Sequence, residues 1–224
     1  MPIELQSIIK TYRMGSENFN ALDGITATIK DGEFIAIMGP SGSGKSTLAN
    51  IIGGLDTPSS GKIFVNKEDI SRAWDRALSH YRNKKVGFVF QTFNLQPHYT
   101  ALENVMLPLI FSKVRLRARK KKAVACLEAV GLGDRMKHKP GELSGGQRQR
   151  VSIARSLANN PEIIIADEPT GNLDSKRSTE IIALLKKLRE EKNITLIIIT
   201  HDMNIAHQAD RVIYIQDGKI KKAR

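Results

Sequence analysis

The chain has 224 residues, which is enough for one or two domains of about 150 residues and for burial of about 70% of the surface that the unfolded chain exposes. Its 35 Lys and Arg against 23 Asp and Glu give a formal net charge of +12, and 41% of the residues are hydrophobic. This composition is typical of a globular protein and excludes a disordered tail protein.

The cysteine content and the apolar runs indicate where in the cell the chain is located. The single cysteine, Cys126, can form neither an internal disulfide nor a cysteine-based zinc site, which favours a reducing cytosol. The longest apolar run, Val105–Phe111, is much shorter than the roughly 20 residues of a membrane span. Glu4 and Lys10 interrupt the N-terminal segment before any stretch of signal-peptide length. The sequence therefore predicts that this chain neither crosses a membrane nor is exported.

In chain order, the first predicted elements are strands. Residues 1–30 and Gly61–Val65 have the pattern of short exposed strands, which predicts a small antiparallel sheet on the flank of the fold. Other runs are continuously apolar, which is typical of strands covered on both faces of a parallel sheet. These predicted buried strands are Phe34–Met38, Val86–Phe90, Ile163–Ala166, Leu196–Ile199 and Val212–Ile215.

Apolar residues at helical spacing predict amphipathic helices between the strands. One covers roughly Arg117–Val130, and a second covers Gln147–Ala158. A third begins near Ser175 and carries its apolar stripe to Leu188. Because residues 92–160 contain helices and no strong strand, we expect them to interrupt the alternating strand and helix order.

A glycine-rich segment follows the first buried strand directly. Its sequence, GPSGSGKST, matches the phosphate-binding pattern G-x-x-x-x-G-K-[ST]. Glycines let several backbone N–H groups point at one anion, and the helix that follows offers the positive end of its dipole. Lys45 supplies a mobile positive charge for the β and γ phosphates, and the Ser46 hydroxyl is placed to ligate Mg²⁺. The expected nucleotide-binding residues are Gly39, Pro40, Ser41, Gly42, Ser43, Gly44, Lys45, Ser46 and Thr47.

The strands, the helices and this loop together predict the fold. It is an α/β fold, a P-loop NTPase core with a mainly parallel sheet, an inserted helical subdomain and a small antiparallel β flank. We expect a single nucleotide-binding domain over residues 1–224, with residues 1–91 and 161–224 as the core and residues 92–160 as the helical subdomain.

Three other predicted strands also end in polar functional groups. Gln91 follows one strand, Asp167 and Glu168 follow another, and His201 follows a third after Thr200. In an open parallel sheet the ligand site lies outside the carboxyl ends of the strands. We therefore expect these side chains, which are far apart in the sequence, to meet beside the phosphate-binding loop.

The chemistry of each group predicts its role at a triphosphate. Asp167 is suited to holding Mg²⁺, since hard cations take carboxylate oxygens, and Gln91 can bind the metal or the attacking water. Glu168 can accept a proton from that water or orient it, and His201 can donate to the γ-phosphate. The candidate catalytic residues are Glu168, His201, Gln91 and Lys45, and the candidate magnesium ligands are Ser46, Gln91 and Asp167.

A second anion site is indicated by Leu143–Gln147, LSGGQ, at the start of a predicted helix. One interpretation is a capping box, with Ser144 at the N-cap and Gln147 three residues later. In the other, Gly145 and Gly146 strip side chains from a helix N-terminus so that a phosphate can approach. Both interpretations can hold at once.

Taken in order, GPSGSGKST, Gln91, LSGGQ, the IIIADE strand end, Gly171–Asp174 and His201 resemble the ATP-binding subunit of ABC transporters over nearly the whole chain. The resemblance implies that two copies pack head to tail. Each Mg²⁺-ATP would lie between one subunit's phosphate-binding loop and Ser144–Gln147 of the other, with Asp174 at the dimer contact. It also implies that Tyr12 stacks on adenine; without the resemblance Tyr12 can equally be a surface aromatic.

Two segments, Thr100–Leu109 and Asp167–Ser175, resemble the branch of this family that includes lipoprotein-releasing, macrolide-exporting and cell-division transporters. That branch works with a separate integral membrane permease, which ATP-driven closure moves mechanically. The resemblance implies a peripheral position on the cytoplasmic face of the cell membrane. The family receives the permease's coupling helix at the position of Phe93–Tyr99, where apolar residues can equally be plain core.

The run Lys113–Lys122 contains seven basic residues in ten. A solvated helix face and contact with anionic lipid are both open interpretations. Nucleic acid is the rival partner, and a nucleic-acid-handling ABC ATPase is the alternative function. That alternative fits poorly, because the chain has no long coiled coil, zinc cysteines or duplicated cassette. The presence of Glu168 and His201 argues against a non-hydrolysing ATP clamp, and a small-molecule kinase is disfavoured because no lid or acceptor pocket is apparent.

Overall fold

The computed structural model describes residues 1–223 of the chain. Its centre is a six-stranded sheet in the order β10-β9-β3-β8-β7-β6, in which β9 to β6 are parallel neighbours and β10 is antiparallel to β9. The predicted α/β fold with a mainly parallel sheet is confirmed. The strands are β3 (Phe34–Met38), β6 (Val86–Phe90), β7 (Ile163–Asp167), β8 (Thr195–Ile199), β9 (Arg211–Gln216) and β10 (Lys219–Ala223).

The central strands are continuously apolar because both faces of the sheet are covered. Every residue of β3 and β8 is buried. Along β8, Leu196 and Ile198 belong to one hydrophobic cluster, whereas Ile197 and Ile199 belong to another on the opposite face. Successive side chains of a strand point to opposite faces, so two cores require an unbroken apolar run.

A second, antiparallel sheet has the order β2-β1-β4-β5. The prediction of short exposed strands at the N-terminus was wrong in length and in burial. β1 and β2 are long, and one face of the pair is buried through Ile3, Ile8 and Ile25, so the apolar residues are spaced out rather than continuous. Bulges in the β1–β2 pairing further break the alternation. The strands are β1 (Ile3–Met14), β2 (Glu17–Ile29), β4 (Ser60–Val65) and β5 (Glu68–Asp69).

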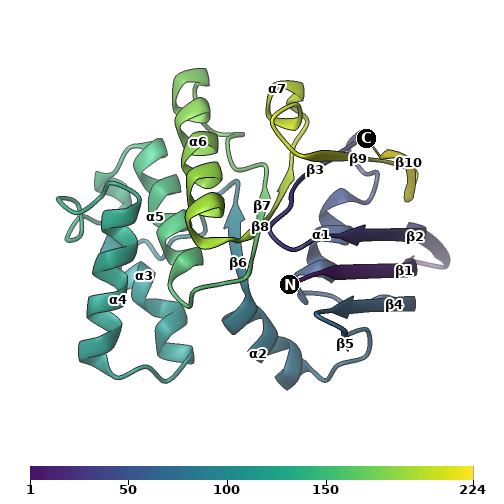
Figure 1. The fold of residues 1–224 in the computed structure, drawn as a ribbon, viewed down its shortest axis with the longest axis horizontal. Coiled ribbons are helices and arrows are strands. Elements are labelled where there is room, and N and C mark those ends of the chain that lie inside the picture. Colours follow the sequence, from purple (N-terminus) through teal and green to yellow (C-terminus); the bar gives the residue numbers. More distant parts are fainter. Residues whose placement is uncertain (224) are drawn as a thin grey trace.

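The helices flank the two sheets, with the α3–α6 group on one side of the parallel sheet and the antiparallel sheet on the other (Figure 1). The predicted helix at Gln147–Ala158 begins two residues earlier, because Ser144 is its N-cap. Residues 92–160 contain no strand, as expected. The helices are α1 (Lys45–Ile52), α2 (Asp75–Lys85), α3 (Ala101–Phe111), α4 (Leu116–Ala129), η1 (Pro140–Glu142), α5 (Gly145–Leu157), α6 (Ser175–Lys192) and α7 (Met203–Ala206).

The helices of residues 92–160 do not have a core of their own. Val105, Leu127 and Val151 belong to the same buried cluster as Val89 and Ile164 of the central sheet. The helical region is therefore continuous with one face of the sheet. Among residues 1–223, no helix combines the length and the apolar character that a membrane span requires.

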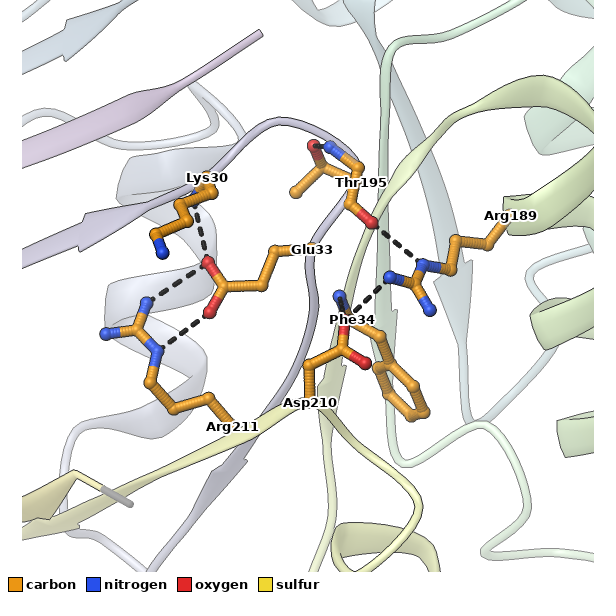
Figure 2. Close-up of polar contacts among 8 residues, drawn as sticks. Lys30, Glu33, Phe34, Arg189, Thr195, Asp210 and Arg211 are labelled. Atoms are coloured by element: carbon orange, nitrogen blue, oxygen red, sulfur yellow. Dashed lines mark hydrogen bonds and ion pairs between the residues drawn. The ribbon is translucent and has the colours of Figure 1, made fainter.

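At the amino ends of the parallel strands, a polar network joins three segments (Figure 2). Arg211 forms an ion pair with Glu33, at 2.8 Å, and Arg189 pairs with Asp210, at 2.6 Å. Asp210 also accepts a hydrogen bond from the backbone N–H of Phe34. These contacts fix the starts of β3 and β9 to α6. The functional groups lie at the opposite edge of the sheet, at the carboxyl ends of the strands.

Candidate functional site

The strand registers bring the predicted polar groups to one edge of the sheet. Phe90, which precedes Gln91, pairs with Asp167, and Asp167 pairs with Ile199 on the next strand. Ile199 in turn pairs with Ile37, near the end of β3. Four segments that are widely separated in sequence therefore surface side by side, as the sequence predicted.

The loop after β3 has a backbone that requires glycine. Gly39 has a φ of 148°, and a Cβ there would lie 1.9 Å from the carbonyl oxygen of Ile215. Gly44, with a φ of 102°, is the N-cap residue of α1. At Gly42, with a φ of 75°, no heavy atom lies within 4 Å of the place of a Cβ. The backbone at Gly42 is thus open to the close approach of a ligand.

Lys45 lies at the mouth of this loop. Its Nζ atom donates hydrogen bonds to the carbonyl oxygens of Gly39, at 2.9 Å, and Pro40, at 2.6 Å. Both acceptors are neutral, and among the described residues no carboxylate oxygen lies within 4 Å of this Nζ atom. A phosphate can replace these carbonyls as a stronger, charge-assisted acceptor.

The acidic pair at the end of β7 lies in two different environments. Burial raises the pKa of the Asp167 carboxyl, and the neighbouring charge of Glu168 adds to this, against the hydrogen bond of Ser46. Glu168 has left the strand, with a φ of 46°, and its backbone N–H donates to the carbonyl oxygen of Ile199. The reversed backbone aims the Glu168 side chain away from the continuation of β7.

Glu168 meets His201 across the strand ends. The Nδ1 atom of His201 lies 2.9 Å from Oε1 of Glu168, and since a carboxylate only accepts, the imidazole donates. This hydrogen bond, together with the charge of Glu168, raises the pKa of His201 above its ordinary value. The imidazole itself is exposed, so its Nε2 atom is accessible to a ligand.

The donors beside the loop suit Mg²⁺. Ser46 lies beside Asp167, and burial together with the neighbouring charge of Glu168 raises the pKa of the Asp167 carboxyl in spite of the nearby Lys45. A divalent cation would supply a counter-charge to this carboxylate. Two protein oxygens are enough, because Mg²⁺ keeps several waters and takes the rest of its ligands from phosphates.

Gln91 is held by the loop that follows β7. The side chain of Asn172 donates to the carbonyl oxygen of Gln91, at 2.9 Å. A Cβ on Gly171 would lie 2.5 Å from Nε2 of Gln91, so a larger residue at position 171 would displace this amide. Gln91 therefore lies beside the end of β7, as predicted.

Sequence reasoning missed the arginines that hold the segment after Gln91. Phe93 and Asn94 both have positive φ angles, and their carbonyl oxygens accept hydrogen bonds from the guanidinium of Arg155. The guanidinium of Arg148 lies 5.2 Å from the centre of the Phe93 ring. Both arginines are on α5, so this helix holds the segment that follows Gln91.

Tyr12 lies beside the phosphate-binding loop, and the stacking of its ring on adenine stays a prediction. Its hydroxyl donates to Oδ2 of Asp56, at 2.7 Å, and the Nζ atom of Lys10 lies 5.1 Å from the ring centre. Tyr12 lines a pocket of about 220 Å³ together with residues 42–47 and Phe19. The sequence analysis did not identify Phe19 as a residue of this pocket. Phe19 pairs with Tyr12 across the β1–β2 hairpin, so the register of the hairpin could have indicated it.

At LSGGQ the capping box is present. The Ser144 hydroxyl accepts from the backbone N–H of Gln147, and the Gln147 side chain accepts from the backbone N–H of Ser144. Gly145 and Gly146 form the first turn of α5. Among the residues that the structure describes, no part of Ser144–Gln147 lines the Tyr12 pocket or the cleft that contains Glu168 and His201.

Asp174 caps α6, because its side chain accepts from the backbone N–H of Arg177, at 2.9 Å. The segment Phe93–Tyr99 is not plain core, since Tyr99 is 44% exposed. Asn94 of that segment lines a groove between β6 and the helical region, together with Phe88, Pro108 and Phe111.

The chain is similar to known proteins over nearly its whole length. The model of the ABC transporter family matches residues 22–171. The ABC transporter ATP-binding protein MJ0796 of Methanocaldococcus jannaschii is 51% identical, over 98% of this chain and 95% of its own length. A dimeric structure of MJ0796, described as a post-hydrolysis state bound to ADP and Pi, superposes with a TM-score of 0.90 at 49% identity, covering 99% of this chain and 97% of that one.

Two further relatives lie in the predicted branch. The lipoprotein-releasing system ATP-binding protein LolD of Pseudomonas fluorescens is 46% identical, over 94% of this chain and 93% of its own length. The macrolide export ATP-binding/permease protein MacB of Rhodopirellula baltica is 47% identical over 97% of this chain, which spans only 32% of that protein. None of these relatives is described as acting on nucleic acid, so the nucleic-acid alternative finds no support among them.

Proposed function

The chain belongs to the ABC transporter family and is an ATP-binding ATPase of that family, and we propose the following roles for its residues. Two copies bind two Mg²⁺-ATP molecules in a head-to-tail dimer. Hydrolysis opens the dimer and drives a separate membrane permease. The observation that carries the proposal is the convergence of Lys45, Gln91, Asp167, Glu168 and His201 at one sheet edge.

Each ATP is held mainly by the phosphate-binding loop of one chain. The backbone N–H groups of residues 39–47 and the ammonium of Lys45 bind the phosphates, since the loop glycines leave the backbone open there. Tyr12 stacks on the adenine with the ring face that Lys10 leaves free. Ser46, Asp167 and the amide oxygen of Gln91 hold Mg²⁺, which neutralises charge on the phosphate oxygens when it is bound.

Hydrolysis rests on the pair of Glu168 and His201. Glu168 accepts a proton from the attacking water or orients it, because it is not needed by the metal and its backbone turns it out of β7. His201 is held by Glu168 through Nδ1, which leaves Nε2 to donate to the γ-phosphate. Gln91 aligns the water from the neighbouring strand end.

The second copy completes the site. The N-terminus of α5 is free of side chains at Gly145 and Gly146, and it offers its dipole and the Ser144 hydroxyl to the γ-phosphate bound by the partner. Two observations support this. Among the described residues, Ser144–Gln147 line neither the Tyr12 pocket nor the cleft that contains Glu168 and His201 of the same chain. The related MJ0796 forms dimers. Asp174 caps α6 beside this contact.

The permease binds on the groove between β6 and the helical region. Phe88, Pro108 and Phe111 give this groove an apolar lining, and Asn94 connects it to the Gln91 segment. The chain acts in export and lies peripherally at the cytoplasmic face of the membrane, and its similarity to the LolD and MacB relatives supports this assignment. A direct test is phosphate release from Mg²⁺-ATP by the purified chain, which Glu168→Gln should reduce at least about a hundredfold. Full activity of that variant would overturn the assigned role.

A further inference from the structure

The turn between α3 and α4 exposes large apolar side chains. Ile110 and Phe111 end α3 and are 45% and 75% exposed, and Leu116, the first residue of α4, is 66% exposed. The turn is ordered, since the backbone N–H of Lys113 donates to the carbonyl oxygen of Ile110, at 2.9 Å, and Val114 packs against the core. The apolar side chains are therefore presented outward by a fixed backbone.

Basic residues surround these apolar side chains. Arg119 folds back and donates to the carbonyl oxygen of Val114, and the other six cations of the run are exposed. The chain has no acidic residue between Glu103 and Glu128. Within residues 1–223, no ion pair to a carboxylate involves any cation of this run. The exposed cations are Lys113, Arg115, Arg117, Lys120, Lys121 and Lys122.

This charge does not stabilise α4. The helix has the basic Arg117 in its first turn and the acidic Glu128 in its last, whereas the helix dipole favours the opposite arrangement. Arg117 and Lys121 are also like charges four residues apart, which repel each other. A solvated face that served only the helix would not place its cations in this way, so the pattern indicates an anionic partner.

We propose that the α3–α4 corner, comprising Ile110, Phe111, Lys113, Arg115, Leu116, Arg117 and Lys120–Lys122, contacts the anionic lipid headgroups of a bilayer. Its cations bind the headgroup phosphates, and its apolar side chains enter the boundary between headgroups and acyl chains. A nucleic-acid backbone supplies the charge but no apolar phase for Ile110 and Leu116, so a bilayer fits better. Phe111 also lines the groove assigned to the permease, which places the corner on the permease side; only this orientation rests on the proposed function.

Co-sedimentation of the full chain with vesicles, without nucleotide, tests the surface. The vesicles contain phosphatidylcholine with or without 30% phosphatidylglycerol. We expect the variant Arg117→Glu/Lys120→Glu/Lys121→Glu to bind the anionic vesicles at least about tenfold more weakly than the wild type. The matched control, Lys30→Glu/Lys62→Glu/Lys67→Glu, changes the net charge equally around β2 and β4, which lie across the molecule from α4 (Figure 1).

The control variant should bind the anionic vesicles with an affinity within about twofold of the wild type. Neither the wild type nor either variant should bind the neutral vesicles. Equal losses in the two variants, or equal binding to neutral and anionic vesicles, would overturn the proposal. Binding to a random DNA duplex is measured in parallel. If the corner variant loses DNA binding and keeps vesicle binding, the partner is nucleic acid. Because the assay needs no ATP, its failure is distinct from a failure of the ATPase.

A second readout locates the apolar side chains. Trp74, which is 86% exposed, is replaced by Phe, and Leu116→Trp is introduced as the single reporter. The reporter's fluorescence should shift to shorter wavelength with anionic vesicles and stay unchanged with neutral ones. An unchanged spectrum on vesicles that the chain demonstrably binds would exclude entry of the corner into the bilayer.

Discussion

The Nδ1 atom of His201 lies 2.9 Å from Oε1 of Glu168, although the two residues come from different strand ends. The carboxylate therefore orients the imidazole and raises its pKa. An imidazolium beside a carboxylate is favoured below the unfolded His pKa of about 6.5, and this contribution is lost as the pH rises through the raised folded value. Because His201 is 76% exposed, solvent screening keeps the stability effect small.

A proton NMR titration of the metal-free chain tests this pair. In Glu168→Gln the neutral amide can no longer attract the imidazolium, so the pKa of His201 should fall toward about 6.5. The resonances of His80, His98, His138 and His207 serve as internal controls. A His201 midpoint that is identical in the two proteins would contradict the assigned contact.

Removal of the Lys45 ammonium should weaken nucleotide binding. Charge-assisted hydrogen bonds are worth about 1.5–3 kcal/mol each, so Lys45→Ala should lower the affinity for ATP by about 10- to 100-fold in calorimetry. Lys30→Ala removes an exposed lysine that lies elsewhere and should change the affinity less than about twofold. Equal affinities for the Lys45 variant and the wild type would reject the phosphate-binding assignment.

Loosening the Arg155 contact should uncouple Gln91 from α5. Arg155→Lys cannot reach the carbonyl oxygens of both Phe93 and Asn94, so we expect a loss of about 1–3 kcal/mol in the free energy of unfolding. Hydrogen exchange at residues 92–95 should rise, and ATP hydrolysis should fall while ATP affinity stays constant. Arg76→Lys, at an exposed position, is the control. Unchanged exchange and unchanged hydrolysis in Arg155→Lys would remove the proposed coupling.

Ser144→Asp separates the two interpretations of LSGGQ. Aspartate is as good an N-cap as serine, so the variant should unfold within about 0.5 kcal/mol of the wild type. It also places a negative charge where the partner's γ-phosphate is expected. Combined with Glu168→Gln, so that hydrolysis does not reopen the dimer, it should therefore abolish ATP-dependent dimer formation in analytical ultracentrifugation. A variant that still forms the dimer with ATP would indicate that Ser144 serves the helix alone.

The buried strands and the site edge could be predicted because the signal is local. Runs such as Phe34–Met38 are apolar on both faces, and the parallel arrangement then determines where the strand ends lie. β1 and β2 were mispredicted because burial of one face, with bulges, leaves a broken pattern. α2 escaped prediction because only Leu78 and Tyr81 of that helix are buried.

The contacts that hold the site could not be read in the same way. Arg155 meets Phe93 and Asn94 only because α5 packs back onto a segment about sixty residues earlier, and nothing in the local pattern marks such a contact. The partners of Tyr12 are similar, since Asp56 comes from the segment after α1. The sequence motifs therefore identify the functional side chains, whereas the contacts that hold them in position depend on tertiary packing.

The most direct measurement is the mass of Glu168→Gln by size-exclusion chromatography with light scattering at saturating Mg²⁺-ATP. If two chains enclose ATP and hydrolysis reopens them, this variant should elute as a dimer with ATP and as a monomer with ADP. The double variant Lys45→Ala/Glu168→Gln, which lacks the phosphate-binding ammonium, should stay monomeric throughout. A monomer of Glu168→Gln under saturating ATP would contradict a site shared between two copies.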